Sequence, residues 1–226
     1  MRSSIFKLNS TESHYYVDCS NEIRTINEIY QKMKCLVMDY LVLDNCSSSN
    51  RNMIMSKKEE LLSVAEDKVR KGGYNNFSFR EIANEVGIKS ASVHYHFPTK
   101  ADLGAALAHQ YTDAFLAALG DVDDIKARGE NPIDIYTQIF KGALLTDDKM
   151  CLCGLLGAQN ESLPEKVQVE VKRFFAKNLT WLNAAHTANG ESNPAHAAIT
   201  TVSLLEGAMM ISKALNDHSY FTLATQ

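Results

Sequence analysis

The 226-residue sequence has little of what secreted and membrane proteins require. Its five cysteines, Cys19, Cys35, Cys46, Cys151 and Cys153, form no framework spacing, and their odd number argues for a reducing compartment. No apolar run approaches the roughly 20 residues of a membrane span, and the N-terminus lacks the apolar core of a secretory signal. With 45% hydrophobic and 22% charged residues, we expect a globular cytoplasmic protein without a membrane partner.

The sequence also lacks the common signatures of catalysis. It contains no Walker loop, no dinucleotide fingerprint and no HExxH helix. We therefore expect no enzyme, no metal site and no cofactor. A helical-bundle enzyme or an interaction protein without DNA binding is the alternative from another class. That alternative needs a convergent polar constellation in the second half of the chain, and the sequence indicates none.

Charge is distributed unevenly, although the net charge is only −4. Residues 1–55 carry six basic and six acidic side chains, and residues 56–100 carry eight basic and six acidic ones. Residues 101–226 carry nine basic and fifteen acidic ones. The one net-positive segment suggests an anionic partner for that part of the chain.

Hydrophobic periodicity and capping residues predict an all-α protein from residue 56 onward. Ser56, Ser78 and Thr99 are expected N-caps, and Ser162 with Glu165 is an expected capping box. The expected helices are 57–71, 79–86, 89–97, 100–119, 132–145, a short helix within 150–160, a helix from about 163 to 188, and 194–215.

Residues 1–54 lack this periodicity. They are interpreted either as a genuine N-terminal arm or as an unstructured extension from an over-long gene model whose start is Met53 or Met55, and the second interpretation is favoured. We expect them to be dispensable for DNA binding.

Residues 78–97 have the pattern of a helix–turn–helix motif. Ala83 is small where two helices approach closely, Gly87 supplies a turn with positive φ, and Val93 inserts the second helix into the core. Any one of these residues is common, but all three at this spacing, between caps and after an amphipathic helix, favour the motif.

The stretch FSFREIANEVGIKSASVHYHFPTKADLGAAL resembles the DNA-binding domain of the TetR/AcrR family of transcriptional regulators. The resemblance rests on Ser78, the pairs at 82–83 and 87–88, the run HYHF at 94–97, and Lys100, and it is close over residues 57–110. His94 departs from the tyrosine that the family commonly has there. The resemblance implies a three-helix DNA-binding domain at 55–115 and a helical bundle at 116–226 for effector binding and dimerisation.

The expected DNA contacts lie on the second helix of the motif and its flanks. The N-terminal part of that helix is expected at base edges in the major groove, with Arg80 arriving from the preceding helix or remaining a solvated charge. His94, Tyr95 and Lys100 are expected at phosphates, whereas Phe97 is expected in the core. The full predicted set is Ser78, Arg80, Lys89, Ser90, Ala91, Ser92, His94, Tyr95, His96 and Lys100.

The run at 92–97 allows two other interpretations. A metal site is disfavoured because His94 and His96, two residues apart on a helix, point about 200° from each other. Packing of the helix end by Tyr95, His96 and Phe97 is the second alternative, and for Phe97 it is the preferred one.

The last long helix carries two apolar stripes, which predicts one stripe facing its own core and one facing a second copy of the chain. A monomer with a fully buried last helix is the alternative. The family resemblance implies dimerisation through the last two long helices. The first stripe contains Ala195, Ala198, Val202, Leu205 and Met209, and the second contains Thr201, Leu204, Ala208, Ile211 and Leu215.

The resemblance further implies a ligand-responsive homodimer, a repressor that a small-molecule effector releases from a palindromic double-stranded DNA operator. Candidate pocket residues are Tyr136, Phe140, Phe174 and Trp181. Cys151 is either a thiol sensor of electrophiles or oxidants, which would make the protein a thiol-switched repressor, or a small buried side chain. Burial of Cys151 is the preferred alternative.

Overall fold

A computed structural model describes residues 56–226, so the predictions for residues 1–54, including Cys19, Cys35 and Cys46, lie outside the described residues. The described part is entirely helical, as the sequence predicts. Its helices are α2 (Lys57–Gly72), α3 (Phe79–Val86), α4 (Ser90–His96), α5 (Lys100–Leu119), α6 (Val122–Ala127), α7 (Pro132–Leu145), α8 (Leu152–Ala158), α9 (Glu165–Ala188), α10 (Pro194–Leu215) and α11 (Ser219–Ala224), with a short 3₁₀ helix at Asn160–Ser162.

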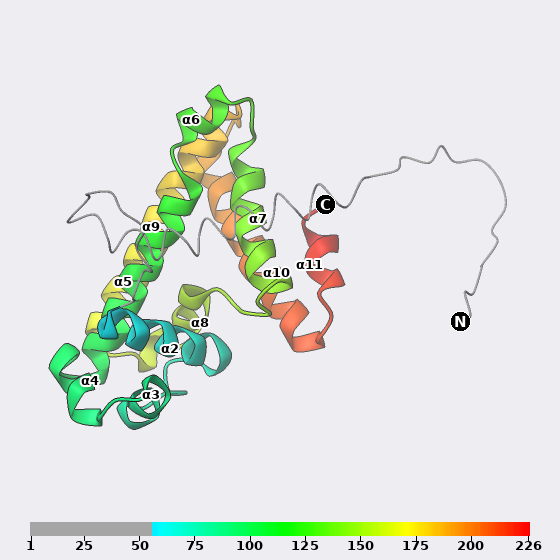
Figure 1. Cartoon of the computed structure of the whole chain (residues 1–226). Coiled ribbons are helices and arrows are strands. Elements are labelled where there is room, and N and C mark those ends of the chain that lie inside the picture. Colours follow the sequence, from blue (N-terminus) through cyan, green and yellow to red (C-terminus); the bar gives the residue numbers. More distant parts are fainter. Residues whose placement is uncertain (1–55) are drawn as a thin grey trace, which may run out of the picture.

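Helices α2, α3 and α4 group at one end of the molecule (Figure 1), and α5 and α9 rise from that end and pack along each other. α10 packs against α9, and α11 packs against α10. α5 runs unbroken through the expected domain boundary at residues 115 and 116. The reading end, which is the end formed by α2, α3 and α4, is therefore joined to the bundle by one continuous helix.

Local capping fixes where most of these helices begin. Ser56, Ser78 and Thr99 each form a capping box, in which the hydroxyl accepts from a backbone N–H three residues on and the acid there accepts from the cap. The capping box expected at Ser162 and Glu165 is wrong. Pro164 takes the N-cap position, so Glu165 is the first helical residue, and Ser162 donates to the Gln159 carbonyl at 2.8 Å.

The core of the reading end is a small apolar cluster between its three helices. These side chains are at most 5% exposed, as the sequence periodicity predicts. Burying them against one another fixes the crossing of α3 and α4. They are Leu61, Leu62, Ala65, Val69, Ile82, Ala83, Val93 and Phe97.

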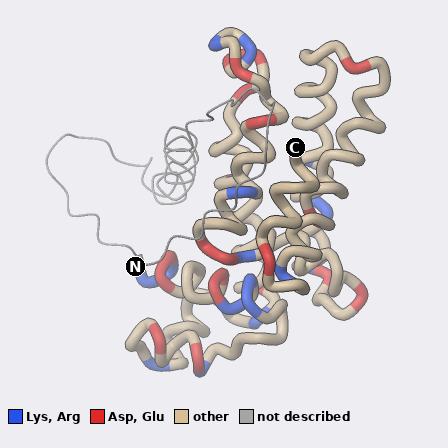
Figure 2. The backbone as a smooth tube through the Cα atoms, turned by 90° about the vertical axis from the view of Figure 1, so that its right-hand side faces the viewer, with Lys and Arg blue, Asp and Glu red and all other residues tan. Residues whose placement is uncertain are grey.

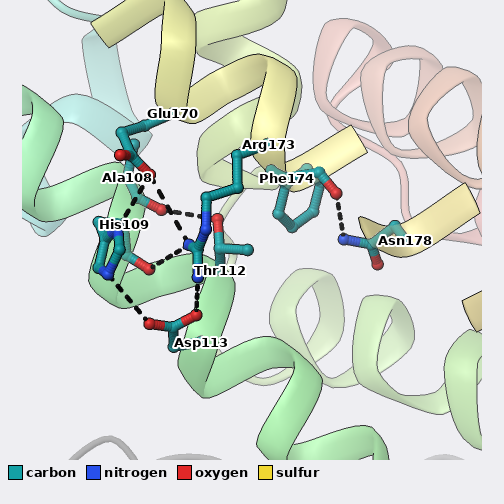
Figure 3. Close-up of polar contacts among 8 residues, drawn as sticks. All are labelled: Ala108, His109, Thr112, Asp113, Glu170, Arg173, Phe174 and Asn178. Atoms are coloured by element: carbon teal, nitrogen blue, oxygen red, sulfur yellow. Dashed lines mark hydrogen bonds and ion pairs between the residues drawn. The ribbon is translucent and has the colours of Figure 1, made fainter. Parts of the chain in front are cut away.

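Polar side chains join α5 to α9 (Figure 3). The imidazole of His109 lies between two carboxylates, with Nε2 3.2 Å from Asp113 Oδ2 and Nδ1 3.0 Å from Glu170 Oε2. Arg173 on α9 pairs with Asp113 and donates to the His109 carbonyl. Since α5 begins inside the reading end, this network couples the orientation of that end to α9.

The helix α10 is long and apolar enough, by length and composition alone, to cross a membrane. Its first stripe is buried from Ala198 to Met209, whereas Ala195 is exposed. In the second stripe Leu204, Ile211 and Leu215 are exposed, and Ala208 is buried. The two stripes therefore face in different directions, mostly as expected, and the last helix of this chain is not fully buried.

Candidate nucleic-acid interface

The turn between α3 and α4 is closed by a left-handed glycine. Gly87 has φ 73° and ψ 33°, and the next N–H, of Ile88, donates to the Ala83 carbonyl at 2.9 Å. A Cβ at Gly87 would meet nothing within 4 Å, so the position needs glycine for its backbone conformation and not for space. Ala83 and Val93 are buried at 1% and 0% exposure, which confirms the packing predicted for the motif.

The first turn of α4 is open to solvent. Lys89 is its N-cap and makes no capping hydrogen bond. Lys89, Ala91 and Ser92 are exposed, and Ser90 is half-buried. The four residues predicted to reach base edges thus lie together at the start of one short helix, whose other face is anchored by Val93.

At the C-terminal end of α4, some of the ring-bearing side chains pack inside the protein and others are accessible to solvent. The His94 ring packs edge-on against Phe79 at 4.8 Å, and its Nδ1 lies 3.2 Å from the Pro98 carbonyl. Tyr95 is 85% exposed, and its ring meets the half-buried His96 ring edge-to-face at 5.2 Å. Phe97 is 3% exposed, which confirms its predicted place in the core. Tyr95 is therefore the ring most available to a partner.

The side chains of Ser78 and Lys100 already have intramolecular partners. The Ser78 hydroxyl donates to Glu81 at 2.8 Å within the capping box. The Lys100 ammonium donates to the Phe77 carbonyl at 2.7 Å and lies over the rings of Tyr74 and Phe77. Burial lowers the pKa of Lys100. Lys100 thus supports the loop before α3, and its contact with phosphate stays a prediction.

The cations of residues 56–100 other than Lys100 fall into two groups. Within residues 56–100, Lys57, Lys68, Arg70 and Lys71 form ion pairs with nearby carboxylates. Lys58, Arg80 and Lys89 have no acidic partner among the described residues, and Arg80 and Lys89 are exposed on α3 and at the start of α4. Figure 2 shows Lys and Arg interspersed with Asp and Glu over the reading end.

The four predicted pocket residues pack mainly on other aromatic rings of the bundle. Phe115 on α5 contacts the rings of Tyr136, Phe140 and Phe174 edge-on, at centroid distances of 5.5, 5.8 and 5.5 Å. Tyr136 stacks on Trp181 at 5.8 Å, and its hydroxyl donates to Asn178 at 3.0 Å. These contacts account for the rings as core; their role as pocket lining stays a prediction.

A polar cluster, which the sequence does not predict, lies where the reading end meets the bundle. It consists of Arg70 on α2, Cys151 at the N-cap of α8 and Glu206 on α10, and we call it the junction cluster. Two of its members are buried, and the third, Glu206, is half-buried with its Oε1 enclosed. Burial raises the pKa of Glu206 to about 7, and burial together with the Glu206 charge raises the pKa of the Cys151 thiol well above its usual range. Cys151 is 2% exposed, which favours the buried interpretation over a reactive thiolate.

Comparison with known proteins assigns this architecture. Residues 61–107 match the family model described as bacterial regulatory proteins, tetR family. The fold is similar to a TetR transcriptional regulator from Legionella pneumophila, with 34% identity, a TM-score of 0.70, and coverage of 77% of this chain and 95% of that one. A TetR-family regulator from Agrobacterium tumefaciens is 29% identical, with a TM-score of 0.67 and coverage of 75% and 93%. No curated protein matches the sequence.

Proposed function

Because the chain belongs to the TetR family and is thus a DNA-binding transcriptional regulator, we propose that it is a cytoplasmic repressor that a small apolar ligand releases from a palindromic operator. Regulators of this family are generally not enzymes, and they typically act as dimers with small-molecule effectors. The observation that carries the proposal for this chain is that two exposed cations beside the open first turn of α4, Arg80 and Lys89, have no acidic partner among the described residues.

The contacts with DNA divide into two kinds. Lys89, Ala91 and Ser92 lead into the major groove, where a lysine can reach guanine O6 and N7 and an alanine can touch a thymine methyl. Tyr95 and His94 at the other end of α4 meet phosphates, which position the protein without reading sequence. Because most side chains in the first turn are small, part of the specificity comes from DNA shape.

Two copies of the motif are brought together by α10. One α4 helix offers few base contacts, and a two-fold dimer doubles them and makes the operator a palindrome. Leu204, Ile211 and Leu215 are 46%, 51% and 55% exposed on the outer face of α10, and large apolar side chains gathered on one face mark an interaction site. Nothing within 4 Å would meet a Cβ at Gly207, so a partner helix can approach closely there.

Release requires that a ligand favour a conformation whose two α4 helices no longer fit adjacent major grooves. The aromatic group around Phe115 supplies the apolar surroundings of such a ligand. A thiol-switched repressor acting through Cys151 is the weaker candidate, because burial suppresses the thiolate that the switch needs.

The test is operator binding measured by fluorescence anisotropy, with palindromic DNA taken from upstream of the gene. Lys89→Ala should weaken binding to this DNA about tenfold or more and relax base preference. Tyr95→Phe, which keeps the ring and removes the hydroxyl, should weaken binding to all sequences alike. A protein that binds random and operator DNA equally well would contradict the proposal.

A further inference from the structure

The junction cluster contains two buried polar atoms without partners. Arg70 is 5% exposed; its Nε donates to the Met150 carbonyl at 2.7 Å, and its Nη1 lies 3.0 Å from Glu66 Oε1. Its Nη2 has no hydrogen-bond partner among the described residues, and the same holds for Glu206 Oε1. Buried donors and acceptors in folded proteins are almost always paired, so these two atoms indicate a missing polar partner.

The two side chains act on the same small region. The positive charge of Arg70 lowers the pKa of Glu206, and the Glu206 carboxyl acts on the Cys151 thiol both through its charge and through a hydrogen bond. The Glu206 carboxyl lies over the bare backbone of Gly154, where an added Cβ would collide with its Oε2. The cluster thus offers one donor, Nη2, and one acceptor, Oε1, beside the first turn of α8.

The kinds of group that can satisfy both atoms are few. An amine would pair with Glu206 but would face the guanidinium of Arg70. A carboxylate would pair with Arg70 but would face Glu206. A neutral group that both donates and accepts completes both atoms without adding a buried charge, and a hydroxyl is the smallest such group on an organic ligand.

Aromatic rings lie beside the Arg70 side of the cluster. The Arg70 guanidinium lies 5.7 Å from the centroid of the Tyr111 ring, and Tyr111 in turn packs against Phe115 and Phe174 at 6.3 and 5.8 Å. A ligand whose hydroxyl reaches the cluster therefore has aromatic rings beside the rest of its frame.

We propose that the junction cluster is the polar end of the effector site and that it binds a neutral hydroxyl group carried on an aromatic frame, as in phenol. The hydroxyl donates to Glu206 Oε1 and accepts from Arg70 Nη2. Because Arg70 belongs to α2 and holds the Met150 carbonyl, the ligand contacts a side chain of the DNA-binding domain directly. This assignment rests on the proposed ligand-responsive function, whose effector it describes.

Calorimetric titration of the full chain with phenol and with toluene tests the assignment, because the two probes have similar size and differ in the hydroxyl. We expect phenol to bind at least about tenfold more tightly than toluene. Glu206→Met removes the acceptor at nearly the same volume and should abolish that difference, while Glu191→Met, at an exposed position, should keep it. If Glu206→Met does not fold, Glu206→Gln should reduce the preference for phenol at least about threefold.

Three outcomes would overturn the assignment: no binding of phenol, equal binding of phenol and toluene, or an unchanged preference in the Glu206 variants. The first would mean that water alone completes the two atoms. Operator anisotropy separates this failure from failure of the proposed function. If toluene releases the protein from operator DNA and the Glu206 variants respond like the wild type, the protein is a ligand-responsive repressor whose effector binds at a different site. If phenol binding depends on Glu206 but phenol does not release the protein from operator DNA, the assignment of the binding site stands and the proposed ligand-released repressor is contradicted.

Discussion

The reading end exposes charged side chains, whereas α10 exposes apolar ones. Among the described residues, the reading end exposes one large apolar side chain, Tyr95 at 85%, and presents Arg80 and Lys89 without acidic partners. α10 buries the carboxyl of its one acid, Glu206, and presents a row of large apolar side chains. Unpaired charge in water costs little and is available to phosphate and bases, whereas exposed apolar surface is stabilised by being covered. The exposed residues of that row are Leu204, Ile211 and Leu215. Ile199 and Met210 are exposed as well, but they lie on another side of the helix because each residue turns by about 100°.

Placing charge on the apolar face should have the largest effect. In the variant Leu204→Glu with Ile211→Glu, four carboxylates would meet across the two-fold interface of the proposed dimer. We expect a monomer in light scattering and a loss of operator affinity of at least about a hundredfold, because each monomer keeps only one half-site.

Leu145→Glu is the control for this variant, since Leu145 is 39% exposed but lies on α7. It should remain dimeric and bind DNA normally. A double variant that stays dimeric would show that the outer face of α10 is not the interface.

Removing the cations Arg80 and Lys89 tests the reading end. The double variant Arg80→Ala with Lys89→Ala should weaken operator binding by about 1–3 kcal/mol for each of the two side chains that contacts a base. For each side chain that contacts a phosphate, the slope of log affinity against log salt concentration should become shallower by about one. Lys71→Ala is the matched control, because Lys71 lies on the same domain but pairs with Asp67 at 2.6 Å. Salt titrations of anisotropy measure both quantities. Equal effects in the double variant and in the control would mean that pairing does not decide which cations bind DNA.

The sequence predicts the reading end better than the junction. The capping boxes at Ser78 and Thr99 and the turn at Gly87 depend on residues at most a few positions apart, so local pattern is enough. The box at Ser162 is wrong because Pro164 stands at the N-cap. The helices α6 and α11, each of six residues, escape prediction because so short a segment shows little periodicity.

The junction cluster could not be found by the same means. Arg70 and the Met150 carbonyl are 80 residues apart in sequence, and Glu206 reads as one acid in an apolar helix. Burial and pairing of such groups depend on tertiary packing. The signal that remains in the sequence is a lone acid, Glu206, between the apolar Leu205 and Gly207 in a helix that has few charges.

Glu206 should make stability fall as pH rises toward neutrality. Its pKa is about 7 in the folded chain and 4.5 ordinarily, so between these values the folded state binds a proton that the unfolded state has lost. The stabilisation from the protonated carboxyl is complete below about pH 4.5 and is lost as pH rises through 7. Above pH 7 the folded state must hold the ionised carboxylate, which costs free energy. Glu206→Met removes this cost, so at about pH 8 the variant should be more stable than the wild type by up to about 3 kcal/mol.

Urea unfolding followed by circular dichroism at about pH 5, 6, 7 and 8, at one protein concentration, measures that difference. The gain in Glu206→Met should grow with pH, whereas Glu191→Met should track the wild type throughout. A gain that is the same at every pH would reflect packing alone and would contradict a buried, titrating carboxyl.

The smallest expected effect concerns Cys151, which lies with Glu206 in the junction cluster. Burial and the neighbouring carboxylate raise the pKa of its thiol and keep it protonated, and the thiolate is the form that reacts with electrophiles and oxidants. Its Sγ also accepts a hydrogen bond from the Gly154 N–H at 3.4 Å, as an N-cap side chain does. Wild type, Cys151→Ser and Cys153→Ser should therefore all stay on operator DNA in mild peroxide, as measured by anisotropy. Serine keeps a capping oxygen, so Cys151→Ser should also unfold at nearly the wild-type urea concentration. Release by peroxide that requires Cys151 would make the buried thiol a sensor and favour the thiol-switched repressor.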